Sequence, residues 1–214
     1  MRKYLICFIT TFIFYQGFTQ EKILIDNITI VGNKITKETI ILREITFKKG
    51  DFLSQTEIDI KTKQSKENLV NLNLYNFVDI SSENSGGETN IIIEVVERWY
   101  IWPYPILELS ERNFNVWWKE FKESNYSDFS RMNYGVYLVW ENFKGRNDLL
   151  KIKYRRGFKE HYLFRYEIPY FNKEKTIGIT AFAQQFRRKK SFYNTIDNKL
   201  LYYENGDKYT TKDS

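Results

Sequence analysis

The chain has 214 residues, of which 42% are hydrophobic, 18% aromatic and 28% charged. This composition is ordinary for one or two folded domains and excludes a disordered or fibrous protein. The net charge of +6 suits binding to anionic partners, of which nucleic acid and anionic lipid headgroups are the two candidates.

The N-terminus has the anatomy of a signal peptide. Arg2 and Lys3 precede an apolar run that ends near Tyr15, and small residues follow. A membrane helix is the alternative, but about twelve apolar residues are fewer than the roughly 20 that span hydrocarbon. We expect residues 1–19 to be removed. The only cysteine, Cys7, would leave with them, so the mature chain is expected to have no disulfide and no cysteine metal site.

The composition changes near Trp99. Residues 21–98 hold four aromatic, ten basic and 13 acidic residues, whereas residues 99–214 hold 28 aromatic, 21 basic and 14 acidic residues. The two segments therefore carry net charges of −3 and +7 and serve different environments. We place a domain boundary between residues 98 and 99.

The first segment begins as an α+β unit. Residues 22–31 alternate isoleucines around Asp26-Asn27, which predicts a strand with a kink or bulge. Thr36 is expected to cap a helix that Gly50-Asp51 would end, with an apolar side formed by Ile40, Ile41 and Ile45.

A capping box at Ser54–Glu57 predicts a second helix from Gln55 to about Asn71, because the hydroxyl and the carboxylate satisfy each other's backbone donors. Two strands follow, at 77–82 and 89–96, and the predicted order is β-α-α-β-β. The expected core stripe of the second helix is Ile58, Thr62, Ser65, Leu69 and Leu72, and that of the last strand is Ile91, Ile93 and Val95.

The stretches ITIVGNKIT, IILREITFKKGD, SKENLVNLNLYNFVDI and NIIIEVVER carry a resemblance. They resemble a POTRA domain, the periplasmic module that precedes the barrel in the BamA/TamA-like outer-membrane assembly superfamily. An unrelated βααββ domain is the alternative. Residues 21–98 are thus predicted to be a POTRA domain.

The second segment has the dyad pattern of transmembrane β-strands. Residues 132–141, 150–155 and 161–168 each alternate apolar side chains with polar or charged ones, and turn residues separate them. A first strand is expected at 100–109 and later ones at 176–186 and 199–204. In a soluble β-domain so many exposed aromatic rings would favour aggregation, whereas in a bilayer they suit the two interfaces.

Four of the five tryptophans lie between residues 99 and 118. We expect Trp99 and Trp102 where the first strand leaves the periplasm, and Trp117 and Trp118 near the other rim or in the first external loop. Packing in a core is the alternative. The predicted membrane-interface aromatics are Trp99, Trp102, Trp117, Trp118 and Trp140.

The family's barrel begins directly after its last POTRA domain, so the resemblance extends to about residue 205. It implies that residues 99–214 are the N-terminal part of an outer-membrane β-barrel. Only five or six strands are predicted, fewer than the roughly eight that close the smallest membrane barrels. We therefore expect either the front part of a longer protein or strands that pair with another chain. Tyr154–Phe158 is similar to the family's Arg-Gly-aromatic loop motif, but it occurs too early and is interpreted as strand and turn.

Enzyme chemistry finds little support. The single histidine, His161, has no cysteine or acidic cluster near it in sequence, and phosphate-loop and nucleophile-elbow patterns do not occur. We predict no catalytic, cofactor or metal residues. The basic run at 187–190 could suggest nucleic acid, but its neighbours alternate with lipid-facing side chains and a signal peptide would export the chain, so no nucleic-acid partner is expected.

The resemblance implies a part in inserting outer-membrane proteins, with unfolded outer-membrane proteins, outer-membrane lipid and periplasmic accessory proteins as partners. The POTRA domain would lie in the periplasm. Alternatives are a channel that secretes one partner and a truncated, non-functional remnant. The expected acceptor of a substrate strand is Phe77, Val78, Asp79, Ile80 and Ser81, and the expected wall of the barrel seam is Tyr100, Ile101, Trp102, Ile106 and Leu107.

Overall fold

A computed structural model of the chain describes residues 22–85, 88–109, 114–172, 174–188, 190–196, 199–204 and 210–213. The predicted signal peptide lies outside these residues. The chain falls into two compact units. The first holds the chain up to Gly32 together with Glu44–Val96, and the second holds Asn33–Arg43 together with the chain from Glu97 onward.

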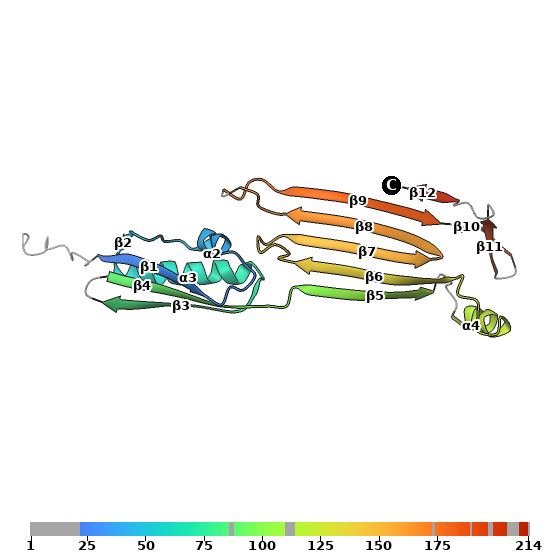
Figure 1. Ribbon diagram of the computed structural model, residues 1–214, viewed down its shortest axis with the longest axis horizontal. Coiled ribbons are helices and arrows are strands. Elements are labelled where there is room, and N and C mark those ends of the chain that lie inside the picture. Colours follow the sequence, from blue (N-terminus) through green and yellow to red (C-terminus); the bar gives the residue numbers. More distant parts are fainter. Residues whose placement is uncertain are drawn as a thin grey trace, which may run out of the picture. The chain divides into compact units, whose positions relative to one another are not determined.

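The first unit is built on a four-stranded sheet (Figure 1). Its order is β2-β1-β4-β3, with β1 parallel to β4 and antiparallel to β2. The register of β1 shifts between Ile25 and Asn27, which confirms the predicted bulge. The strands are β1 (Ile23–Val31), β2 (Phe52–Leu53), β3 (Tyr75–Ser85) and β4 (Glu88–Glu97).

Two helices interrupt these strands in the sequence. Helix α3 (Gln55–Asn71) starts at the predicted capping box: the Ser54 hydroxyl accepts from Glu57 N, and the Glu57 carboxylate accepts from Ser54 N at 2.8 Å. The bonds that the Ser54 N–H and hydroxyl donate to the Glu57 carboxylate lower its pKa. Helix α2 (Glu38–Glu44) differs from its prediction, because it ends before Gly50-Asp51 and begins two residues after Thr36.

The core of the first unit contains the residues that the pattern predicted. Ile91, Ile93 and Val95 of β4 are buried, and so are Ile58, Ser65 and Leu69 of α3. Thr62 and Leu72 are only half-buried. Ser65 is tolerated inside because its hydroxyl donates to Lys61 O and accepts from Thr46 N.

The turn after β1 admits only glycine without strain. Gly32 has φ +94°, and a Cβ at this position would lie 1.9 Å from Val95 O. We expect Gly32→Ala to lower the free energy of unfolding of the first unit by about 3 kcal/mol or more, since backbone strain and a clash with a strand carbonyl add. Pulse proteolysis of the full chain in urea, followed with an antibody against residues 21–98, measures this.

Gly50 supplies the matched control. Its φ is +91°, but a Cβ there meets nothing within 4 Å. Gly50→Ala therefore reports the φ strain alone, and we expect it to cost about 1 kcal/mol. Equal losses for the two variants would show that the approach of Gly32 to β4 does not matter.

The second unit is dominated by a sheet of order β12-β9-β8-β7-β6-β5, whose neighbours are antiparallel throughout (Figure 1). A separate hairpin pairs β10 with β11, and helix α4 (Phe114–Glu123) follows β5. The strands are β5 (Ile101–Leu109), β6 (Met132–Glu141), β7 (Leu149–Gly157), β8 (Lys159–Ile168), β9 (Ile179–Arg188), β10 (Lys190–Ile196), β11 (Lys199–Glu204) and β12 (Thr211–Asp213).

The pairing register gives this sheet two different faces, since alternate residues share a face and so do cross-strand partners. The polar face carries Lys151, Lys153, Arg155, His161 and Arg165 among other residues. We call the other face the apolar face; apart from Arg156, Glu160, Gln185 and Arg187 near one end, it is formed by Ile101, Pro103, Pro105, Leu107, Leu109, Met132, Tyr134, Val136, Leu138, Trp140, Leu150, Ile152, Tyr154, Tyr162, Phe164, Tyr166, Ile168, Ile179, Ala181 and Ala183.

The predicted strands are confirmed, with ends that move by at most three residues. The sequence patterns did not predict β2, β10, β12 or helix α4. Tyr154–Gly157 lies in β7, in agreement with its interpretation as strand rather than loop. Among the helices of the described residues, none is long and apolar enough to cross a membrane.

Candidate functional site

The expected substrate acceptor lies on one strand at the end of the first unit's sheet. Phe77, Val78, Asp79, Ile80 and Ser81 all belong to β3, which pairs only with β4 among the described strands. Val78 and Ile80 are buried, whereas Phe77 is 55% exposed. The backbone of β3 is therefore available along its other side for a further strand.

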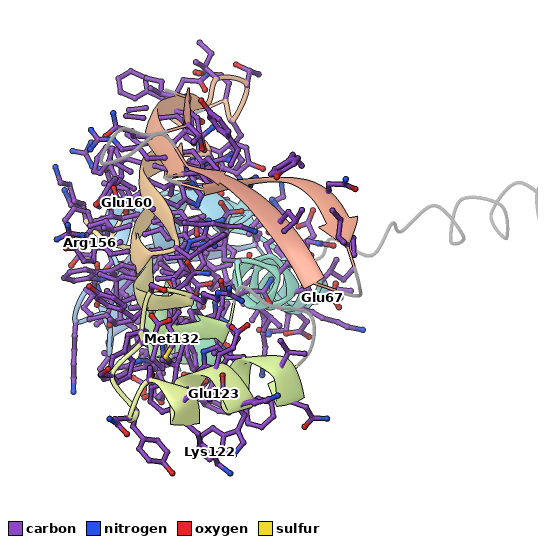
Figure 2. All side chains as sticks on the ribbon, turned by 90° about the vertical axis from the view of Figure 1, so that its right-hand side faces the viewer. Glu67, Lys122, Glu123, Met132, Arg156 and Glu160 are labelled. Atoms are coloured by element: carbon purple, nitrogen blue, oxygen red, sulfur yellow. The ribbon has the colours of Figure 1, made fainter. Side chains whose placement is uncertain are left out.

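A shallow hollow on helix α3, which packs against β3, lies beside this edge. Lys66 Nζ donates to Asp79 Oδ1 at 2.9 Å, which ties the hollow to β3 and lowers the pKa of Asp79. Glu67 lies on the exposed side of the helix (Figure 2). The hollow thus offers both charges and an apolar surface; it is lined by Lys63, Lys66, Glu67, Val70 and Asn71.

The expected seam strand is also terminal in its sheet. Ile101, Trp102, Ile106 and Leu107 lie in β5, which pairs only with β6 among the described strands, and Tyr100 directly precedes it. Leu107 is 74% exposed. Pro103 and Pro105 lie opposite Leu138 and Val136, and prolines within sheets are confined to edge strands because they donate no ladder bond.

The sequence reasoning missed a buried polar cluster in the second unit, which we call the anchor cluster: Thr36, Glu97, Tyr100, Asn142 and Gly145. The Glu97 carboxylate accepts from Thr36 N at 2.6 Å, and Asn142 Nδ2 donates to Thr36 Oγ1 at 2.8 Å. The Tyr100 hydroxyl lies 3.3 Å from Thr36 Oγ1, and Lys37 N donates to Gly145 O at 2.9 Å. Burial raises the pKa of Tyr100, so its hydroxyl stays protonated.

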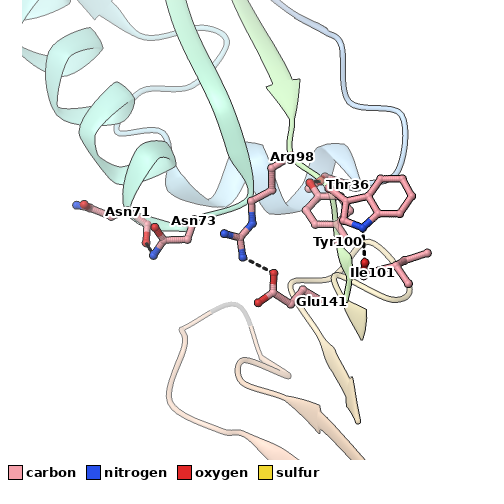
Figure 3. Close-up of polar contacts among 8 residues, drawn as sticks. Thr36, Asn71, Asn73, Arg98, Tyr100, Ile101 and Glu141 are labelled. Carbon is pink, nitrogen blue, oxygen red and sulfur yellow. Dashed lines mark hydrogen bonds and ion pairs between the residues drawn. The ribbon is translucent and has the colours of Figure 1, made fainter. Parts of the chain in front are cut away.

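These bonds explain why the helix-cap prediction for Thr36 is wrong. The hydroxyl is engaged by Tyr100 and Asn142, which are 64 and 106 residues away in sequence, and no local pattern carries that information. Figure 3 shows Thr36 and Tyr100 together and, close by, the ion pair in which Arg98 Nη2 donates to Glu141 Oε2. The cluster fixes residues 33–37 to the start of β5 and to the β6–β7 turn.

The β6–β7 turn is built to hold its side of the cluster. Asn142, Gly145 and Asn147 have positive φ, and the Asn142 Oδ1 accepts from Asn147 N at 2.9 Å. The buried Asp148 carboxylate accepts from Lys144 N, Arg146 N and the Tyr166 hydroxyl. The turn is therefore rigid, with its buried polar groups satisfied.

Removing the Asn142 side chain is expected to free residues 33–37. Asn142→Gly tolerates the φ of +50° and deletes only the amide bonds, at a cost of about 2 kcal/mol. Trypsin cleavage after Lys34 in the full chain should accelerate roughly 30-fold, the rate equivalent of that energy. Asn147→Gly, at φ +58°, is the control and should leave the cleavage rate nearly unchanged. Unchanged cleavage in both variants would mean that the anchor cluster does not hold this segment.

Three predicted interface tryptophans lie where β5 begins, which we call the proximal end of the sheet. Trp99 is 65% exposed, and its indole N–H donates to Ile101 O. Trp140 lies on the apolar face and packs edge-on against Phe143, with ring centroids 4.8 Å apart. Phe143 in turn packs edge-on against Tyr166, with centroids 6.3 Å apart. Trp102, by its register with Val139, falls on the polar face instead.

The other two predicted tryptophans lie beyond the opposite, distal end of the sheet, in α4. Trp117 is buried among aromatic rings, and Trp118 is 38% exposed. Seen from this end, α4 with Lys122 and Glu123 lies nearest Met132, and Arg156 and Glu160 follow farther along the row of strand ends (Figure 2). On the apolar face near the same end, the rings of Tyr154 and Tyr162 pack at a tilt, with their centroids 5.5 Å apart. Aromatic rings thus flank the apolar face at both ends.

The remaining sequence candidates form no chemical centre in the structure. His161 lies on the polar face opposite Arg155, with its ring 5.8 Å from that of Phe186. Arg187 and Arg188 end strand β9 and pair with β12. Across the residues that the structure describes, no group of three His, Cys, Asp or Glu side chains is arranged to hold a metal ion.

Residues 23–98 match the family model described as "POTRA: Surface antigen variable number repeat". No curated protein matches the sequence. Among solved structures, the chain is similar to BamA from Haemophilus ducreyi lacking POTRA domains 1–3, with a TM-score of 0.50 and 20% identity over 77% of this chain and 28% of that one.

Two CdiB structures match less well. The protein from Acinetobacter baumannii gives a TM-score of 0.42 at 15% identity over 79% of this chain and 30% of that one. The protein from Escherichia coli gives 0.43 at 12% identity over 85% of this chain and 30% of that one. The chain thus spans less than a third of the length of each of these proteins.

The family match and the BamA-like fold agree with the element order of the structure. A four-stranded sheet with helix α3 against it is followed in the chain by an antiparallel sheet that resembles part of a BamA barrel. Residues 23–98 thus match the POTRA family model, and with the sheet that follows them the chain has the fold of the corresponding part of BamA.

Proposed function

We propose that the protein helps to insert outer-membrane proteins, by receiving their unfolded strands on the POTRA domain and passing them to the edge of its membrane sheet. The sheet of β5–β9 lies in the outer membrane, and the POTRA domain lies in the periplasm. The observation that carries the proposal is that β3 and β5 are each paired on one side only among the described strands.

Strand β3 suits an acceptor that does not select sequence. A substrate strand that adds to its free side gains backbone hydrogen bonds whatever its side chains are. Phe77 is exposed on the same strand, and the hollow on α3 adds Lys66 and Val70 beside it. Unfolded barrel proteins, with alternating apolar and polar residues, can place alternate side chains on this hollow and on solvent. Periplasmic accessory proteins would bind other parts of the POTRA surface.

Strand β5 suits a seam that opens. An unpaired edge in hydrocarbon leaves backbone groups without partners, so β5 needs a strand beside it. Pro103 and Pro105 are two residues apart in β5, so their nitrogens, which carry no hydrogen, point to the same side of the strand. Because the pairing of β5 with β6 is intact, we infer that this side is the free edge. The free edge then lacks two central donors, and whichever strand pairs there is held by fewer bonds than within the sheet.

The test of this function is depletion of the protein, followed by quantification of all barrel proteins in the outer membrane. Loss of many unrelated barrels supports an assembly role. Loss of a single secreted protein, with barrel levels unchanged, would replace assembly by a channel that serves one partner. No change in either would exclude both roles.

A further inference from the structure

Helix α4 presents an aromatic surface to its surroundings. Phe114, Trp117, Trp118 and Phe121 recur at the i, i+3, i+4, i+7 spacing of one helix face. Their rings stack on one another, with Trp117 and Phe121 5.0 Å apart, and Tyr126 packs on Phe121 at 5.5 Å. Phe114 is 57%, Tyr126 is 56% and Trp118 is 38% exposed, whereas Trp117 is buried, so the outer part of this cluster has no protein cover among the described residues.

The opposite side of the helix is charged. Lys119 pairs with Glu123 at 3.8 Å, and Glu120 pairs with Arg131 at 2.9 Å. Lys122 lies 5.3 Å from the ring of Trp118, at the border between the two sides. A short helix with an aromatic face, a charged face and a cation at their border has the form of helices that lie in the plane of a membrane interface.

The aromatic surface continues onto the apolar face of the sheet. Phe129, after the helix, packs edge-on against Phe121 at 5.3 Å, and it lines one hollow together with Tyr134 and Phe158. Arg156 and Glu160 line the same hollow, so the charges at this end of the apolar face share it with Phe129, which packs on Phe121 of α4. A surface that covers the apolar face would therefore reach α4 without a break.

The height of α4 agrees with a membrane boundary. From Met132 to Trp140 strand β6 runs about 27 Å at roughly 3.4 Å per residue. A tilt of about 40° reduces this to about 21 Å, close to the apolar band of about 25 Å in membrane barrels. With Trp140 at one boundary, the other falls near Met132, just after the segment that carries Phe129.

We propose that α4 is an interfacial anchor that lies flat in the headgroup layer of the outer membrane, at the distal end of the sheet, with its aromatic face against the acyl chains. Its occupant is the lipid surface rather than another protein. The proposal rests on the membrane location of the sheet given under the proposed function. It goes beyond that function, because the anchor would hold the first loop and the end of the seam strand β5 at a fixed depth.

Depth-dependent fluorescence quenching tests the anchor. Single cysteines replace Phe114 or Tyr126 on the aromatic surface, Glu123 on the charged side, and Ile152 in the middle of the apolar face, each in full-length protein with Cys7→Ser. The fluorophore-labelled proteins are inserted into phosphatidylcholine–phosphatidylglycerol vesicles whose lipids carry nitroxides at the headgroup or deep in the acyl chain. Phe114 and Glu123 lie nine residues apart, on opposite sides of the helix.

Headgroup nitroxides are expected to quench labels at 114 and 126 about threefold more than the label at 123, since such helices bury their apolar face about 5–10 Å. The deep nitroxide should quench the label at 152. Quenching at 152 without a difference between 114, 126 and 123 would overturn the anchor and leave the membrane sheet standing. Loss of quenching at 152 would overturn the membrane location itself, and the anchor with it.

Discussion

A proline at one of positions 77 and 78 is expected to reduce crosslinking of unfolded barrel substrates to β3 about tenfold while the domain stays folded. A proline at the other position is expected to disrupt the fold. Successive residues of a strand direct their N–H groups to opposite sides. One of Phe77→Pro and Val78→Pro therefore removes a donor from the free edge of β3, and the other removes a donor from the β3–β4 ladder. The loss of one backbone hydrogen bond, about 1.4 kcal/mol, gives the tenfold effect.

The pair of variants contains its own control. The ladder-side proline should destabilise the POTRA domain, whereas the edge-side proline should leave its unfolding midpoint nearly unchanged. Val78→Ala keeps the N–H and deletes buried methyl groups, so it separates loss of packing from loss of the donor. The measurement is photocrosslinking from a probe at exposed Ser81 to a radiolabelled unfolded barrel substrate. Full crosslinking with both prolines in a folded domain would remove β3 as the acceptor.

What could be read from the sequence was local. Helix α3 begins where the Ser54–Glu57 capping box placed it, because both partners of that motif lie within one turn. Strand β6 has its predicted bounds, because ten residues of alternating character leave little choice of period. The edge position of the predicted seam strand, from Ile101, also agrees with Pro103 and Pro105, which disfavour a central strand.

What was missed depends on distant partners or on a competing interpretation. Strand β2 has two residues and exists only because Phe52 and Leu53 pair with β1. Thr36 has the residue type of a helix cap, but its partners come from Tyr100 and the β6–β7 turn. Helix α4 did carry a signal, the spacing of Phe114, Trp117, Trp118 and Phe121. That spacing was overlooked because the abundance of aromatic rings favoured an interpretation by composition rather than by period.

A lysine in the middle of the apolar face is expected to prevent stable insertion of the sheet into lipid. Ala183 lies opposite Phe164, which lies opposite Ile152, so all three are at one level of the apolar face. A lysine at the midplane of a membrane barrel costs about 3 kcal/mol, or roughly a 150-fold change in an equilibrium. Ala183→Lys should lower the membrane-inserted fraction of the full chain by that order.

Gln184→Lys is the matched control, because residue 184 follows directly on the same strand and lies on the polar face opposite Leu163. Each variant gains one lysine at neighbouring positions of the same strand, so the two have the same net charge. A difference in their inserted fractions therefore depends on which face of the sheet carries the lysine. The measurement is the fraction of protein that resists alkaline extraction from lipid vesicles, followed across a urea series. If both lysines lower that fraction equally, the sheet does not present Val136, Ile152 and Phe164 to lipid, and the membrane placement of β5–β9 fails; if only Ala183→Lys does, the apolar face is the lipid-facing surface.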